Sequence, residues 1–154
     1  MRSLALATLL ALALPALAHA GTLTPLSAAE VPTLLKPPAH GVRILAVWAL
    51  DCAYCEANMQ ALAKLQRAHP QEIELVTVAT DGIAHDAEIA ARLKAMRMDG
   101  YPSRAYAEAS PERLDYLIDP DWGGETPHTE IIRADGSRQG ISGELTAAQL
   151  QKLL

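Results

Sequence analysis

The stretch VRILAVWALDCAYCEANMQAL, residues 42–62, decides the fold. Its first part, Val42–Ala49, is a nearly continuous β-branched and aliphatic run, which is typical of a strand buried on both faces of a parallel or mixed sheet. Residues 53–69 then place apolar side chains along one helical face, and His69-Pro70 ends this helix. The stretch predicts a central strand that runs directly into a helix.

The rest of the chain alternates strands and helices around one sheet. The expected elements are a strand at Ile73–Ala79, a helix at Asp86–Met98, a short element around Leu114–Ile118, a hairpin of His128–Ala134 and Ser137–Ile141 turning at Asp135-Gly136, and a last helix that starts with the capping box of Thr146 and Gln149. A strand, helix, strand order with short connections predicts a right-handed parallel crossover. We therefore expect an α/β fold, with a central mixed sheet flanked by helices.

The first twenty residues are typical of a cleavable export signal. Arg2 provides the positive start, an apolar run follows, and Ala18-His19-Ala20 places small residues at the cleavage positions. The run is shorter than the roughly 18 residues that span a bilayer, so cleavage is favoured over an uncleaved anchor. The signal predicts a periplasmic protein.

The remaining chain is divided into a lead-in segment and one domain. Residues 21–41 are rich in Pro, Thr, Ser and Ala, so we interpret them as an N-terminal lead-in with at most one helical turn. The domain is then expected at residues 42–154, as a monomer.

Charge and motifs limit the partners and cofactors. Without residues 1–20, 12 basic residues stand against 18 acidic ones, a net charge of −6, which repels nucleic acid. The charges are scattered in both signs, as on a solvated surface. Since no nucleotide, flavin or haem motif occurs in the sequence, we expect no cofactor.

The two cysteines of the chain, Cys52 and Cys55, lie where the central strand becomes a helix. The positive end of the helix dipole stabilises a thiolate, the species that attacks disulfides, so Cys52 is the predicted nucleophile. Cys55 lies one turn further on, and we expect it to resolve the mixed disulfide formed at Cys52.

Three simpler interpretations of the cysteine pair are less favoured. A structural zinc site needs four ligands, and the sequence has no second CxxC and no histidine pair at zinc-finger spacing. A purely structural disulfide closing so small a loop would constrain the unfolded chain little. Two inert thiols are hard to maintain in the oxidising compartment that the signal predicts.

The sequence resembles the thioredoxin superfamily and, within it, periplasmic thiol-disulfide reductases of the TlpA and ResA type. Val47–Cys55 is similar to the family's strand, tryptophan and CxxC passage, and Glu56–Leu62 continues like its first helix. Glu125–Glu130 resembles the family's cis-proline segment. The resemblance covers residues 42–80 and 124–154 and implies a thioredoxin-like fold.

The resemblance also implies substrate-binding residues. Pro127 would be cis and would lie against the cysteine pair, while the backbone of Thr126 would pair with a segment of the bound substrate. Tyr54 would either shape the approach of the partner or face solvent without a role. Trp48 is expected to pack beneath the site, and Trp122 either packs or contacts the partner.

The sequence departs from the family pattern at Asp51, where the family usually has a second tryptophan. A carboxylate at Asp51, with Glu56 also close, is expected to raise the pKa of Cys52 and to favour a reductant over an oxidant. Capping of the helix by Asp51 is an alternative that does not exclude this role.

The acids that usually help the second cysteine are also missing. Asn58 stands where these reductases often have a glutamate, and Ala46 stands where thioredoxin has a buried aspartate. Solvent, Glu56 or Glu125 could therefore deprotonate Cys55.

Two functions follow from these residues. The leading one is an oxidoreductase that reduces disulfides in exported proteins, for instance cysteines of apocytochromes or of metal centres, and is recharged by a membrane electron donor. The alternative is a metallochaperone that holds Cu(I) with Cys52 and Cys55, to which His128 could add a third ligand, since thiolates are soft ligands. The first function requires no bound metal.

Overall fold

The structure is a computed structural model that describes residues 21–153. The predicted signal peptide, residues 1–20, lies outside the described residues. Within residues 21–153, no helix is long and apolar enough to cross a membrane.

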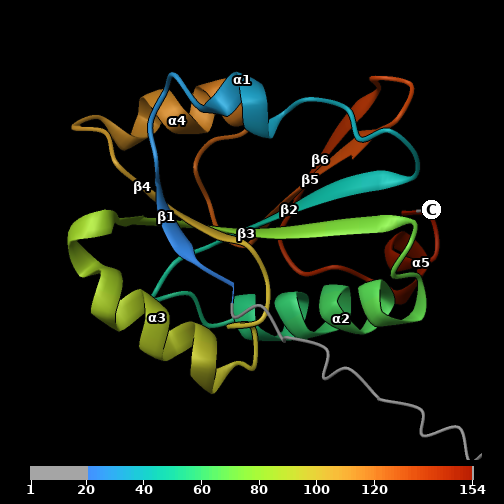
Figure 1. The fold of residues 1–154 in the computed structure, drawn as a ribbon, viewed down its shortest axis with the longest axis horizontal. Helices are drawn as coiled ribbons and strands as arrows, with labels where there is room; N and C mark the ends of the chain where they lie inside the picture. Colours follow the sequence, from blue (N-terminus) through green and yellow to red (C-terminus); the bar gives the residue numbers. More distant parts are fainter. Residues whose placement is uncertain (1–20, 154) are drawn as a thin grey trace, which may run out of the picture.

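One mixed sheet of six strands, in the order β1-β4-β3-β2-β5-β6, forms the centre of the described chain (Figure 1). The strands are β1 (Leu23–Leu26), β2 (Val42–Trp48), β3 (Ile73–Gly82), β4 (Ser103–Tyr106), β5 (His128–Arg133) and β6 (Arg138–Ser142). The predicted central strand β2 pairs parallel with β3 and antiparallel with β5. The predicted hairpin is formed by β5 and β6.

Helices cover both faces of this sheet, as Figure 1 shows. They are α1 (Val31–Leu34), α2 (Cys55–Ala68), the 3-10 turn η1 (Ile83–His85), α3 (Asp86–Ala95), α4 (Pro111–Ile118) and α5 (Ala147–Leu150). Helices α2, α3 and α5 pack on one face, whereas α1 and α4 pack on the other. The α/β fold with a flanked mixed sheet is confirmed.

Strand β2 contributes to a hydrophobic core on each face of the sheet. Ile44 and Trp48 belong to the core beneath α2, and Leu45 and Val47 belong to the core beneath α1 and α4. All four side chains are buried, which explains why β2 is apolar at almost every position instead of alternating.

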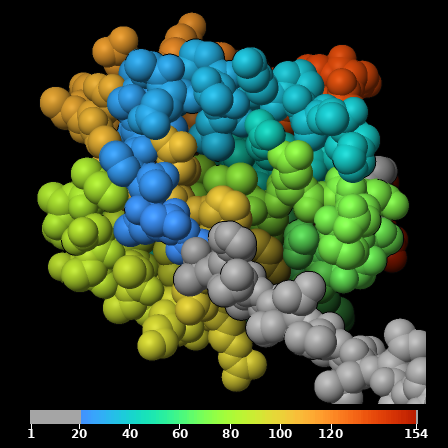
Figure 2. All heavy atoms as spheres, viewed as in Figure 1, coloured from blue at the N-terminus to red at the C-terminus, as the bar shows by residue number. Residues whose placement is uncertain are grey.

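The segment 21–41, which the sequence separates from the domain, contributes an edge strand of the sheet. In β1, Leu23 pairs with Ser103 of β4, and Leu26 is fully buried. Pro25 lies within this strand because an edge strand needs backbone donors on one side only. The space-filling view of Figure 2 shows this segment packed against the body of the molecule.

Three helices differ in their bounds from those expected, and one of them, α3, ends at Ala95 rather than at Met98. Helix α2 begins at Cys55 rather than at residue 53, because the chain first makes a turn in which the N–H of Cys52 donates to the carbonyl of Ala49 over 3.2 Å. The last helix has the predicted capping box at Thr146, but it ends at Leu150 after one turn.

Candidate active site

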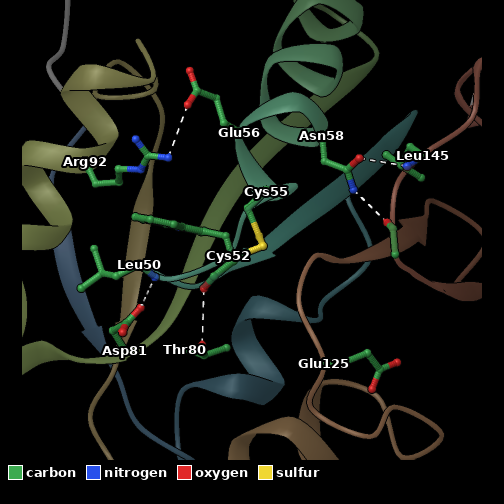
Figure 3. Close-up of a disulfide and its surroundings, with 12 residues drawn as sticks. Leu50, Cys52, Cys55, Glu56, Asn58, Thr80, Asp81, Arg92, Glu125 and Leu145 are labelled. Carbon is green, nitrogen blue, oxygen red and sulfur yellow. Dashed lines mark hydrogen bonds and ion pairs between the residues drawn. A yellow bond between two sulfur atoms is a disulfide. The ribbon is translucent and has the colours of Figure 1, made fainter.

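Cys52 and Cys55 form a disulfide at the end of β2 that leads into α2 (Figure 3), with their Cα atoms 5.5 Å apart. Cys55 is 1% exposed and belongs to the core beneath α2, whereas Cys52 is partly exposed. An incoming partner therefore reaches Cys52 first, which agrees with its predicted role as the nucleophile.

Side chains from β3 and the end of β2 support the turn that carries the disulfide. The N–H of Leu50 donates to Oδ2 of Asp81 over 2.8 Å, and the hydroxyl of Thr80 donates to the carbonyl of Trp48 over 3.4 Å (Figure 3). Trp48 is buried in the same core as Cys55, which confirms its predicted packing role. Asp81 was not predicted, and its only sequence signal is a polar residue near the end of a buried strand.

Strand pairing places the predicted substrate loop at the end of the sheet where β2 leads into the disulfide. The Thr126–Pro127 peptide bond is cis, and His128, which follows it, pairs with Val47 near the end of β2. The carbonyl of Pro127 accepts a hydrogen bond from the N–H of Gly143 over 2.8 Å. Because Pro127 is buried and Thr126 is half-buried, Thr126 is the more accessible residue of the two.

Trp122 packs and also holds the loop that precedes Pro127. Its indole N–H donates to the carbonyl of Glu125 over 2.7 Å, and its ring stacks on His128 with a centroid separation of 4.5 Å. Since the side chain is largely buried, its contacts lie within the chain. Trp122 therefore positions the segment that leads into the cis peptide bond.

The residues predicted to tune or contact the site are placed as follows. Asp51 is exposed, and Tyr54 occupies the N-cap of α2 without a side-chain cap, so Asp51 does not cap this helix. Glu56 forms an ion pair with Arg92 of α3, with 3.4 Å between Oε2 and Nη2 (Figure 3). Tyr54 is 64% exposed beside the disulfide, so its ring is available to a partner.

Asn58 and Glu125, expected near Cys55, interact with groups other than this cysteine. The amide of Asn58 is buried and donates to the carbonyl of Gly143 over 2.9 Å, while its oxygen accepts the N–H of Leu145 over 2.9 Å. Hydrogen bonding with Ser142 lowers the pKa of Glu125. Figure 3 shows the Glu125 carboxylate directed away from the disulfide in that view. Glu56 and Glu125, the two acids expected near Cys55, are therefore engaged by other groups.

Replacing Asn58 by alanine is expected to destabilise the protein by about 2–4 kcal/mol, because two backbone groups would lose their buried partner. Urea unfolding of the oxidised protein measures this difference. Gln60→Ala is the matched control, since Gln60 is exposed on the same helix, and it should change stability by less than about 0.5 kcal/mol. Equal stabilities of the two variants would contradict a structural role for Asn58.

Comparison with known proteins identifies solved structures with a similar fold. The chain matches none of the family models and none of the curated proteins with which it was compared. It is similar to the solved structure of a thioredoxin-related protein from Neisseria meningitidis serogroup B, at 28% identity and a TM-score of 0.62, over 79% of this chain and 85% of that one. This likeness confirms the predicted thioredoxin-like fold.

Two further solved structures share this fold. One is a secreted disulfide oxidoreductase of Mycobacterium tuberculosis, at 18% identity and a TM-score of 0.53, over 73% of this chain and 77% of that one. The other is StoA from Bacillus subtilis, at 20% identity and a TM-score of 0.54, over 76% of this chain and 84% of that one. Together with the CxxC disulfide, the likeness to the thioredoxin-related protein supports thioredoxin-like thiol-disulfide oxidoreductase activity.

The copper-chaperone alternative is not favoured. His128 was expected as an optional third ligand beside the two cysteines, but its Nδ1 lies 3.1 Å from the Ser142 hydroxyl and its Nε2 lies 3.4 Å from Oδ2 of Asp119. The imidazole nitrogens therefore face other side chains.

Proposed function

We propose that this protein reduces disulfides in exported proteins of the periplasm through Cys52 and Cys55. The observation that carries the proposal is the unequal accessibility of the pair, with Cys52 partly exposed and Cys55 buried. A nucleophile that meets the partner and a resolving thiol behind it are what a two-step exchange requires.

The reaction balances with two sulfurs and no bound cofactor. The Cys52 thiolate attacks one sulfur of the partner disulfide, forms a mixed disulfide and releases the first partner thiolate. The Cys55 thiolate then attacks the sulfur of Cys52, which restores the Cys52–Cys55 disulfide and releases the second partner thiolate. Two electrons pass to the partner, and a membrane electron donor reduces the pair again.

The partner would dock on exposed groups around Cys52. Tyr54 presents an exposed aromatic ring on one side, and Thr126 lies on the loop that the strand pairing brings to the same end of the sheet. A segment of substrate would pair with the backbone of Thr126, with Pro127 buried behind it. One monomer provides all of these residues.

Charge near Cys52 favours the reducing direction. The exposed carboxylate of Asp51 precedes Cys52 and disfavours its thiolate, which makes the pair a stronger reductant. The contribution of Glu56 is smaller, because Arg92 offsets its charge.

The proposed location follows from residues 1–20, whose sequence is typical of a cleavable signal. An exported location agrees with a cysteine pair that cycles through the disulfide state.

The reduction potential of the Cys52–Cys55 pair tests the proposal. Equilibration with glutathione or dithiothreitol, followed by thiol trapping, should give a value near that of thioredoxin, about −270 mV. A value near about −120 mV would make the protein an oxidant instead. A pair that does not cycle would exclude the oxidoreductase.

Replacing Asp51 by asparagine is expected to raise this potential by about 5–20 mV, since an exposed charge contributes roughly 0.2–1 kcal/mol and 30 mV corresponds to about 1.4 kcal/mol. The same equilibration measures the shift at low ionic strength. Glu72→Gln removes an exposed charge outside the site and should leave the potential unchanged. A lower potential in Asp51→Asn would contradict the tuning role.

A further inference from the structure

Three side chains of types that can ligate a metal lie close together where the segment after α4 meets the β5–β6 hairpin. This cluster is separate from the disulfide. Its members are Asp119, His128 and Glu130, and one ligand atom from each lies within 4.8 Å of the others. Nε2 of His128 is 3.4 Å from Oδ2 of Asp119 and 3.9 Å from Oε2 of Glu130. The side chains of His128 and Glu130 are each 2% exposed, and that of Asp119 is 17% exposed.

The atoms that face the centre of this cluster have no hydrogen-bond partner. Within the described residues, Nε2 of His128 and Oε2 of Glu130 are buried and unpaired. Buried polar atoms are almost always satisfied, so two unpaired ones aimed at the same point indicate an absent partner. An unprotonated imidazole nitrogen and a carboxylate oxygen can both ligate a cation, and both can also accept hydrogen bonds from a buried water.

The atoms on the outer side of the cluster are all held. Nδ1 of His128 lies 3.1 Å from the Ser142 hydroxyl, and Oε1 of Glu130 accepts a hydrogen bond from Nε of Arg138 over 2.7 Å. Oδ1 of Asp119 accepts the N–H of Asp121 over 3.0 Å. Such outer contacts fix the orientation of metal ligands and, when Nδ1 of a histidine carries the proton, leave Nε2 as the free donor atom.

The backbone leaves room for this arrangement at Gly140. A Cβ atom at this position would collide with Oδ2 of Asp119 and would lie 2.9 Å from Cε1 of His128. A surface hollow of about 320 Å³ is lined by Asp119, Glu130 and Gly140 among others, so it borders two of the three residues of the cluster.

We propose that Asp119, His128 and Glu130 bind a divalent transition-metal ion such as Zn²⁺. One imidazole and two carboxylates are suitable zinc ligands, and a water molecule would complete a four-coordinate site. With metal–ligand distances of about 2.0–2.2 Å, tetrahedral ligand atoms lie about 3.4 Å apart, close to the separation of His128 from Asp119. Two carboxylates against the single Arg138 leave a net negative charge for the ion to neutralise.

The site would stabilise the segment that carries the cis peptide bond. His128 directly follows Pro127, and Asp119 lies at the start of the loop that leads to it. An ion held between these residues would tie both ends of this loop to β5. This inference does not depend on the direction of disulfide exchange.

Zinc binding by the oxidised protein tests the proposal, because the intact disulfide keeps both cysteines from ligating the ion. Calorimetric titration with Zn²⁺ should show one site per chain, and Co²⁺ should give a visible absorption band. Thermal unfolding should shift upward with Zn²⁺ and return after chelation. A Cys52→Ser, Cys55→Ser double variant should bind Zn²⁺ like the oxidised protein.

Variants of the cluster decide whether the ion sits there. Asp119→Asn and Glu130→Gln should each weaken Zn²⁺ binding at least tenfold, whereas Asp121→Asn, an exposed acid of the same loop, should not. Asp119→Asn changes the least buried ligand, so it provides the test if Glu130→Gln does not fold. An oxidised wild-type protein that binds no Zn²⁺ would overturn the proposal and would identify the cluster as a histidine held between carboxylates. Binding that survives Asp119→Asn would also overturn it.

Discussion

Replacing Cys52 by serine is expected to abolish disulfide exchange, because a serine hydroxyl does not ionise at neutral pH and cannot form the mixed disulfide. Reduction of insulin by dithiothreitol, followed by turbidity, should proceed at the uncatalysed rate. Ala53→Ser is the matched control, since it introduces the same side chain at an exposed position between the cysteines and leaves both sulfurs in place. It should keep most of the activity.

The Cys55→Ser variant separates the two roles. Without the resolving thiol, Cys52 still attacks a partner disulfide but the mixed disulfide is not released, so substrates should accumulate as covalent adducts. Mass spectrometry of the trapped species after expression with its export signal would identify them. Adducts on Cys55 in the Cys52→Ser variant, with none on Cys52 in the Cys55→Ser variant, would reverse the assignment.

The elements that sequence patterns predict well are those whose own side chains are buried. Val42–Trp48 is apolar on both faces, so its position in the middle of the sheet follows from its composition. The hairpin and the capping box at Thr146 follow from local turn and cap chemistry, which a few residues suffice to specify.

Strands β1 and β4, which lie at one edge of the sheet, were not predicted from the sequence. Their stability comes from pairing with neighbouring strands. Strand β1 includes a proline, and β4 is a four-residue segment with a buried polar pair, in which the hydroxyl of Thr77 donates to that of Ser103 over 2.8 Å. Neither segment has a periodic apolar pattern of its own. Only the neighbouring strands determine that they are extended.

A similar division applies to the site. The spacing of Cys52 and Cys55 identifies the reacting sulfurs directly from the sequence. The residues that hold the surrounding backbone come from distant segments, as Asp81 holds Leu50 and Asn58 holds Leu145. Contacts of this kind depend on the tertiary fold, so no spacing in the sequence indicates them.

Replacing Trp48 by alanine is expected to destabilise the oxidised protein by about 3–5 kcal/mol, the usual cost of removing a large aromatic side chain from a core. Trp48 is 1% exposed and packs in the same core as Cys55 and Met59 of α2. The loss should appear in urea unfolding, with fluorescence from the remaining Trp122 as the probe.

Trp48→Phe is the comparison that isolates packing from hydrogen bonding. Within the described residues, Nε1 of Trp48 is buried without a hydrogen-bond partner, so phenylalanine removes an unsatisfied donor while keeping a ring in the core. Its cost should therefore be well below that of Trp48→Ala, and the variant should keep its disulfide-exchange activity. Loss of activity in a stably folded Trp48→Phe protein would instead show that the indole acts in exchange and not only in packing beneath the disulfide.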